Sequence, residues 1–366
     1  MSNDLPHTPL EYQSSYEYLE EDEANSIAQL EKIFVGMAET VAEKEGHAHR
    51  AVHAKGQGLL RGSLTVVTGL GSEFAQGIFA QPAEYEVLVR LSSPPAEQLP
   101  DAVSTPRAVA MKVIGVPGER VDAASSEPTQ DFLMVNGPAF VRPGPKGFLR
   151  DSKLLAMTTE KAPLAKKLVS SVLRGTEAVI EAVGGQSAVL KSMGGEPNVH
   201  PLGETYFSQV PFMYGPYMGK FSLVPVSAAL LALKDESLDA GDDNAQRDAV
   251  NTFFASGTNA PAEWELKVQL CTDIEKMPLE DASVEWDQEL SPYVTVAKLV
   301  IPNQVAWDDV HSSQLEDETT FDPWHAVAAH RPLGAINRAR KVVMAASRQF
   351  RSTFNQCPIH EPGFKK

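Results

Sequence analysis

Cysteine is scarce in this chain: Cys271 and Cys357 are its 2 cysteines among 366 residues. Two thiols cannot build the disulfide framework on which small secreted proteins rely. Residues 1–24 also lack the basic and apolar regions of a secretory signal. No apolar run is long enough for a membrane-spanning helix, because Lys, Arg or Gly interrupts the longest runs. We therefore expect a cytoplasmic protein with no membrane partner.

Positive charge is also in deficit. Lysine and arginine total 32 against 48 aspartates and glutamates, which gives a formal net charge of −16. Because such a negative field repels polyphosphates, we expect no nucleic-acid partner. The remaining composition, 43% apolar and 22% charged, is that of a folded globular protein. The length predicts either one large β-rich domain or two ordinary domains, and in both cases a chain long enough to bury a cofactor.

Helical periodicity is clearest near the two ends of the chain. Behind Asn25 and Ser26, which are residue types that cap helices, apolar residues recur at helical spacing up to Val41, and Gly46 offers a stop. This pattern predicts an amphipathic helix that lies on the main body. The expected helices cover 25–45, 146–157, 162–174, 177–193, 245–255 and 332–353.

Between these helices, the sequence favours short β-strands. Glycine, proline and polar clusters separate runs that are rich in β-favouring residues. The expected strands cover 59–67, 85–92, 108–115, 131–136, 205–212, 219–226, 264–272 and 293–301. Such runs are typical of an antiparallel barrel or sandwich. Since there is no internal repeat and no low-complexity linker, we expect one large α+β domain with a barrel and peripheral helices.

Two short motifs have ordinary explanations. Gly69 and Gly71 begin like a dinucleotide-binding turn, but Phe74 takes the place of the third glycine and no βαβ repeat surrounds it. His49 and His53 stand four residues apart, as two zinc ligands on a helix would. However, no glutamate lies between them as in a metalloprotease, and His53 opens a Gly-rich segment that leads into a strand. We therefore expect neither a dinucleotide nor a zinc site here.

A set of ordered motifs carries a family resemblance. Residues 50–58, RAVHAKGQG, resemble the distal-histidine segment of haem catalases and of the small catalase-related peroxidases that lack the extra C-terminal domain. Further matches follow in the same order as in that family: VRLSS at 89–93, PRAVAMK at 106–112, DFLMVN at 131–136, FDPW at 321–324 and RPLGAINRAR at 331–340. The resemblance spans residues 49–351.

The resemblance implies an architecture and a cofactor. We expect a catalase-like antiparallel β-barrel with peripheral helices and a C-terminal proximal haem helix. The expected parts are an acidic N-terminal arm over 1–24, a single haem domain over 25–356 and a C-terminal tail over 357–366. The implied cofactor is haem b, and the implied substrate is a small-molecule peroxide. We also expect a homo-oligomer, with a dimer as the working assumption.

The resemblance assigns roles to individual residues. His53 would move a proton between the two peroxide oxygens, since a neutral imidazole can both accept and return it. Ser92 would hold the His53 ring through a hydrogen bond, and Asn136 would donate to the peroxide oxygen that stays behind. Haem propionates are buried anions that pair best with guanidinium groups. The family places these groups at the positions of Arg50, Arg90 and Arg351.

The proximal side departs from the family pattern. The family's axial ligand is a tyrosinate four residues after an arginine, whereas here Met344 follows Arg340. At about 100° per residue, Arg340, Met344 and Arg351 still lie within about 60° of one another on a helix. A neutral thioether favours ferrous iron, whereas an anionic phenolate favours ferric iron. Three outcomes stay open: haem bound by Met344, haem with water or no ligand on that side, or no haem and a methionine that only packs.

Two hypotheses on function follow. The first is a haem-dependent oxidoreductase that acts on hydrogen peroxide or organic hydroperoxides, with Met344 as the iron ligand and Arg340 beside it in the cofactor site. The second is a pseudocatalase without peroxide turnover, which serves as a haem-binding, ligand-binding or interaction protein. Three arginines around an empty cavity would be costly without their anions, and for that reason we favour retained haem.

Overall fold

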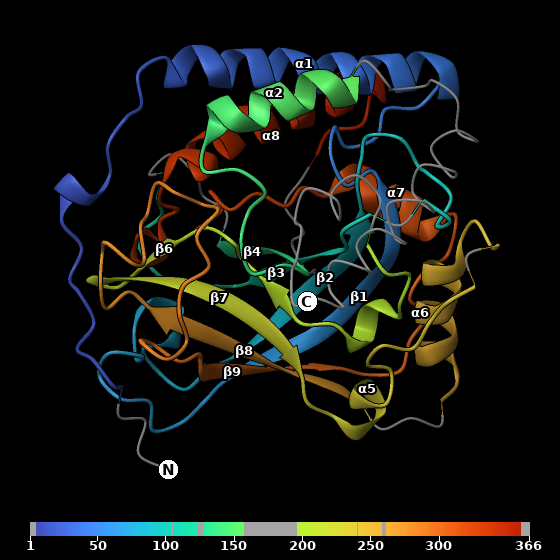
Figure 1. The fold of residues 1–366 in the computed structure, drawn as a ribbon. Helices are drawn as coiled ribbons and strands as arrows, with labels where there is room; N and C mark the ends of the chain where they lie inside the picture. The colour runs from blue at the N-terminus through green and yellow to red at the C-terminus, as the bar shows by residue number, and fades with distance from the viewer. Residues whose placement is uncertain are drawn as a thin grey trace, which may run out of the picture.

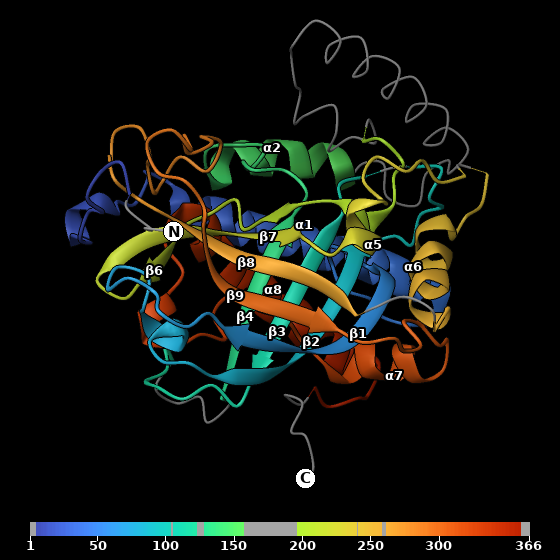
Figure 2. The same ribbon diagram turned by 90° about the horizontal axis from the view of Figure 1, so that it is seen from below.

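A closed antiparallel β-barrel forms the centre of the computed structural model, which describes residues 5–103, 105–122, 128–156, 196–239, 241–257 and 261–359 (Figures 1 and 2). The strands follow one another around the barrel in the order β5-β4-β3-β2-β1-β9-β8-β7, and a β5–β7 pairing closes the ring. A further short strand, β6, pairs with β7. The strands are β1 (Lys55–Val66), β2 (Glu84–Ser93), β3 (Ala108–Ile114), β4 (Thr129–Val135), β5 (Tyr206–Phe207), β6 (Phe212–Tyr214), β7 (Tyr217–Pro225), β8 (Ala262–Leu270) and β9 (Val294–Ile301). This arrangement confirms the predicted α+β barrel.

Alternate side chains of β2 point into the barrel interior and out towards the candidate functional site described below. Val87, Val89 and Leu91 belong to the large apolar cluster that fills the barrel. Leu88 lies on the opposite side of the strand and packs in a different cluster, together with Phe321. Because alternate residues of a strand share a face, Arg90 and Ser92 also point out of the barrel.

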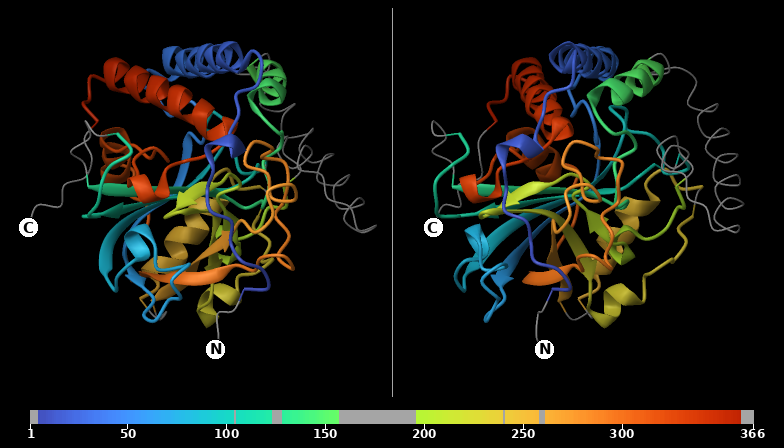
Figure 3. Two further views of the ribbon diagram at one scale, coloured as in Figure 1. Left: turned by 90° about the vertical axis from the view of Figure 1, so that its left-hand side faces the viewer. Right: turned by 60° about the vertical axis from the view of Figure 1, so that its left-hand side comes forward.

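A layer of three helices covers one side of the barrel (Figures 1 and 3). The helices of this layer are α1 (Glu23–Glu45), α2 (Pro145–Ala156) and α8 (Ala335–Phe354). Their apolar faces meet in one cluster, which includes Phe34 of α1, Leu149 of α2 and Val343 of α8. Two more helices, α6 (Ala245–Ala255) and α7 (His311–Glu318), lie at one end of the barrel, and α5 (Ala228–Leu231) is a single turn. In the part of the chain that the structure describes, no helix is both long and apolar enough to cross a bilayer.

Most predicted elements are confirmed within a few residues, and two boundaries differ for local reasons. The strand predicted at 205–212 is divided into β5 and β6, because Gln209 adopts a left-handed φ of 63° and Pro211 follows it. The helix predicted from 332 begins at Ala335, since Gly334 has a φ of 82°. The predicted helices at 162–174 and 177–193 lie outside the described residues. No pattern in the sequence predicted α5 or α7.

Candidate functional site

His53 lies in the loop between α1 and β1, and its backbone has a conformation that residues with side chains rarely adopt. Its φ is 56°, which is uncommon for a residue other than glycine and is often associated with functional sites. The Nδ1 atom of the ring is buried and has no hydrogen-bond partner among the described residues. Burial and the positive charges of Arg90 and Arg340 lower the pKa of His53 to about 3, against a raising effect of the Ser92 backbone. The imidazole is therefore neutral near neutral pH.

The loop that carries His53 is fastened to the barrel and to α8. Arg90 donates from Nη2 to the backbone oxygen of His53 at 2.9 Å. Two residues earlier, the backbone N–H of Ala51 donates to Ser347 Oγ of α8 at 3.1 Å. Ser92 is buried near the end of β2, but its hydroxyl makes no bond to Nδ1 of His53. The role expected for Ser92 stays a prediction.

The three predicted propionate-binding arginines come together in the structure. Arg50 comes from the His53 loop, Arg90 from β2 and Arg351 from α8. The carboxylate of Glu316, in α7, bridges two of them: one oxygen pairs with Nη1 of Arg50 and the other with Nε of Arg90. We call Arg50, Arg90 and Arg351 the arginine cluster.

Backbone oxygens at the end of α7 complete the contacts of the arginine cluster. Arg351 donates to the Glu316 carbonyl at 3.1 Å, and both Arg50 and Arg351 donate to the Thr319 carbonyl, at 2.9 and 3.3 Å. The Nε atom of Arg351 is buried and has no partner within the described ranges. The cluster thus keeps one buried donor available for a further acceptor.

Burial and ion pairing compete at this cluster. Burial raises the pKa of Glu316, but Arg50, Arg90 and Arg351 outweigh that effect and lower it to about 2. Burial lowers the pKa of Arg50 well below its usual value, in spite of the Glu316 charge. Glu316 is therefore ionised at neutral pH. No periodic pattern or family motif pointed to Glu316, although a buried cation cluster requires a counter-anion.

Met344 lines a cleft next to the arginine cluster. The cleft is partly open to solvent, and its walls include Arg50, Val52, Phe321, Met344 and Arg351. Of the three residues expected on one face of this helix, Met344 and Arg351 both line the cleft, whereas Arg340 is not among its lining residues.

Arg340 is surrounded by protein but has few partners. Its Nη1 atom lies 3.4 Å from Asn337 Oδ1. Burial lowers the pKa of Arg340 to about 10, against the opposing charge of Asp322. Arg340 is therefore a positive charge at neutral pH, and its field reaches His53.

Asn136 belongs to a separate polar network. Its Nδ2 donates to the carboxylates of Glu196 and Glu204, each at 2.9 Å, and its Oδ1 accepts from the backbone N–H of Arg107 at 3.0 Å. The Arg107 side chain is buried and pairs with Glu204. Donation from Asn136 to a substrate would therefore require the exchange of one of these bonds. The expected role of Asn136 stays a prediction.

The donor types at the cleft fit a haem. The arginine cluster suits carboxylates, and both Arg351 Nε and His53 Nδ1 are buried atoms with no partner in the described part of the chain. A thioether such as that of Met344 is a known haem-iron ligand. Nowhere in the described ranges, the cleft included, is there a group of three His, Cys, Asp or Glu residues that could hold a metal ion.

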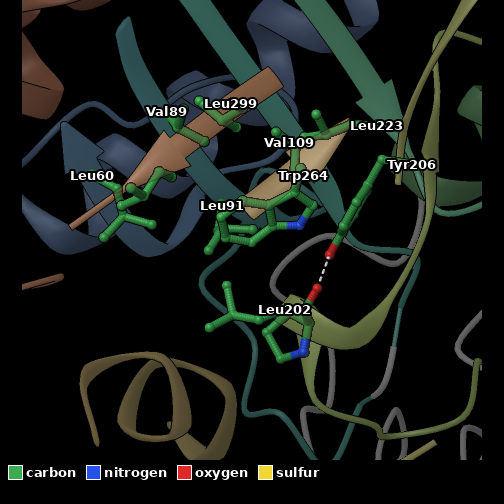
Figure 4. Close-up of a pocket in the computed structure, with 11 residues that line it drawn as sticks. Leu60, Val89, Leu91, Val109, Leu202, Tyr206, Leu223, Trp264 and Leu299 are labelled. Atoms are coloured by element: carbon green, nitrogen blue, oxygen red, sulfur yellow. Dashed lines mark hydrogen bonds between the residues drawn. The ribbon is translucent and has the colours of Figure 1, made fainter. Parts of the chain in front are cut away.

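A second cavity lies inside the barrel and has a different character. It is lined by apolar side chains, including Leu91, Val109 and Trp264 (Figure 4). Tyr206 is the lining residue with a hydroxyl group, and this hydroxyl is already occupied because it donates to the Pro201 carbonyl at 2.7 Å. This cavity is a space between packed core side chains, and it offers no charged group for chemistry.

Comparison with known proteins identifies the fold. No family model and no curated protein sequence matches the chain. Among solved structures, a fungal catalase aligns with a TM-score of 0.59 and 18% identity over 87% of this chain. Catalase A from Saccharomyces cerevisiae aligns with a TM-score of 0.59 and 17% identity over 98%, and a bacterial catalase with 0.59 and 16% over 91%. The chain spans 63% of the fungal, 70% of the yeast and 63% of the bacterial protein. The chain therefore has a catalase-like fold.

Proposed function

We propose that this chain is a haem b-dependent oxidoreductase that acts on hydrogen peroxide or organic hydroperoxides. The observation that carries the proposal is His53, a partly buried imidazole with a pKa lowered to about 3 and a buried Nδ1 that has no hydrogen-bond partner among the described residues. A neutral imidazole can take a proton from one peroxide oxygen and return it to the departing oxygen. Its left-handed backbone costs about 1–3 kcal/mol, a strain typical of functional positions.

Residues around the cleft support the choice of cofactor. The arginine cluster would bind the two haem carboxylates, and Met344 would offer its sulfur to the iron from α8. When bound, haem supplies the redox-active iron at which the O–O bond is broken. The bond from Arg90 to the His53 carbonyl would hold the proton-transferring loop in register with the arginine cluster.

Because Met344 stands in place of a tyrosine, we expect weak turnover of peroxide. A phenolate at this position would compensate the buried positive charge of Arg340, whereas a thioether is neutral and cannot. A thioether also lends less electron density to O–O cleavage than an anionic ligand does. We therefore expect slow disproportionation of peroxide with some one-electron peroxidase activity.

An absorption spectrum of the protein, purified with haem supplied during expression, tests the proposal. We expect a Soret band with about one iron per chain, and reduced-state bands typical of thioether ligation. A folded protein that shows no Soret band would reject the proposal. Sedimentation of the same preparation would test the expected homodimer.

A second candidate is a pseudocatalase that binds a ligand without peroxide turnover. It is favoured by Met344 and by Glu316, which already neutralises part of the arginine cluster. A haem-loaded protein that consumes no peroxide, and whose spectrum is the same with and without peroxide, would support this candidate against the first.

A further inference from the structure

The C-terminal end of α7 occupies the arginine cluster as an anionic ligand would. Glu316 contributes its side-chain carboxylate to Arg50 and Arg90. The carbonyls of Glu316 and Thr319 add acceptors for Arg50 and Arg351. The C-terminus of a helix carries a partial negative charge, which reinforces these contacts. The guanidinium groups thus already bind a carboxylate and a set of carbonyl oxygens that belong to the chain itself.

We propose that Glu316 is a displaceable internal anion, which a ligand with two carboxylates must replace in order to bind at the arginine cluster. The inference rests on the proposed function for the identity of that ligand, a porphyrin dicarboxylate. Binding of the ligand would then be coupled to the release of α7 from the arginine cluster.

Competition for the donors of Arg50 and Arg90 favours replacement, because Arg351 Nε alone offers an incoming carboxylate only a single N–H. Glu316 uses Nη1 of Arg50 and Nε of Arg90, while Nη2 of Arg90 is bonded to the His53 carbonyl at 2.9 Å. A carboxylate binds best when two parallel N–H groups reach it. An incoming carboxylate beside an ionised Glu316 would also meet a like charge at low dielectric. The ligand and Glu316 therefore compete for the same guanidinium groups.

The construction of α7 allows this release. Ser312 is the buried residue of the helix, and Leu315 adds one partly buried apolar contact, to the cluster of Leu59 and Leu88. An element with so little apolar burial belongs to the part of a fold that opens at low cost. The helix is therefore held mainly by polar contacts, those of Glu316 with Arg50 and Arg90 and that of Asp317 with His47 at 3.1 Å.

The segments before and after α7 are fixed, so opening is confined to the helix. Before it, Trp307 stacks on Arg247 at 4.2 Å, and its backbone N–H donates to Asn251 Oδ1 at 2.7 Å. After it, Thr319 and Phe321 are buried. Gly56 lies against the closed position of Glu316, since a Cβ atom at Gly56 would stand 3.0 Å from Glu316 Oε1.

Titration of the haem-free protein with haemin tests the inference, with binding followed by tryptophan quenching and the Soret band. The variants are Glu316→Gln and, as a matched control, Glu318→Gln, whose carboxylate accepts from Gln314 at 2.7 Å on the same helix. If α7 closes the site most of the time, removing the competing charge lowers the haemin Kd by about tenfold or more. Glu318→Gln should leave the Kd unchanged. The dimethyl ester of haemin, which has no free carboxylates, should bind wild type and Glu316→Gln alike.

Hydrogen exchange on the wild-type protein provides a second measurement that needs no variant. Haemin should speed exchange of the α7 amides, because binding releases the helix. Slower exchange in α7, or equal haemin affinities for wild type and Glu316→Gln, would overturn the displacement of Glu316 while haem binding itself stood. If haemin bound to none of the proteins, the proposed function would fail, and the displacement of Glu316 by a porphyrin would fail with it.

Discussion

Arg90 donates a 2.9 Å hydrogen bond from Nη2 to the backbone oxygen of His53, and it thereby links the candidate proton-transfer residue to the arginine cluster. The same arginine contributes the positive charge that, after burial, does most to lower the pKa of His53. One side chain therefore fixes the position of the loop and favours the neutral imidazole. Under the proposed function, Arg90 would therefore couple anion binding to proton transfer.

Removal of the His53 imidazole should abolish most of the peroxide turnover. In His53→Ala, we expect peroxide consumption per bound haem to fall by about 10²–10⁴-fold, the usual contribution of a positioned acid–base group. His7→Ala, in an exposed position of the N-terminal segment, serves as the control. Unchanged turnover in His53→Ala would mean that another group moves the proton.

Replacement of Met344 by tyrosine should raise peroxide turnover. A phenolate would compensate the charge of Arg340 and support ferric iron, so we expect Met344→Tyr to raise kcat/KM for peroxide by about tenfold or more and to shift the ferric spectrum. Met344→Leu keeps the apolar volume without sulfur, and it should lose the thioether bands with no gain in turnover. Identical spectra for all three proteins would show that side chain 344 does not reach the iron.

Acid should weaken the fold through Glu316. The pKa of Glu316 is lowered from 4.5 to about 2 in the folded state. A depressed carboxyl pKa stabilises the folded state above the unfolded-state value, and this contribution, at most about 3 kcal/mol, is lost as the pH falls from about 4.5 towards 2. Urea unfolding at several pH values should therefore show a steeper loss for wild type than for Glu316→Gln. Parallel curves would contradict the ion pairing of Glu316 in the folded protein.

Replacement of Gly77 should destabilise the fold independently of the candidate site. Its φ is 55°, and an added Cβ would overlap the buried ring of His330, whose Cε1 atom would be 2.6 Å away. We expect Gly77→Ala to lower the free energy of unfolding by about 2–4 kcal/mol, from backbone strain and overpacking together. Gly69→Ala shares the positive φ but has open space around it, so it should cost about 1 kcal/mol. Equal losses in urea unfolding would remove the steric argument at Gly77.

Local patterns in the sequence identified much of the barrel and one wall of the site. Strand periodicity located β2, whose alternation directs Arg90 and Ser92 away from the barrel core. Helical periodicity located Met344 and Arg351 on the face of α8 that lines the cleft. Strand and helix periodicity depends on residues that are close together along the chain, and it can therefore be recognised in one sequence. The family motifs added the expectation that Arg50 and Arg90 would meet Arg351.

The tertiary structure alone decided which anion those arginines hold. Glu316 pairs with Arg50 across 266 positions and with Arg90 across 226, and α7 itself is a short polar helix without a clear apolar period. Asn136 is likewise engaged by Glu196 and Glu204, 60 and 68 positions away. Hydrogen bonds and ion pairs over such separations depend on how the chain closes around the barrel, and spacing along the sequence does not encode them. The sequence by itself thus determined the barrel, the arginines and the methionine of the site. Only the tertiary structure brought the Glu316 carboxylate to the arginine cluster.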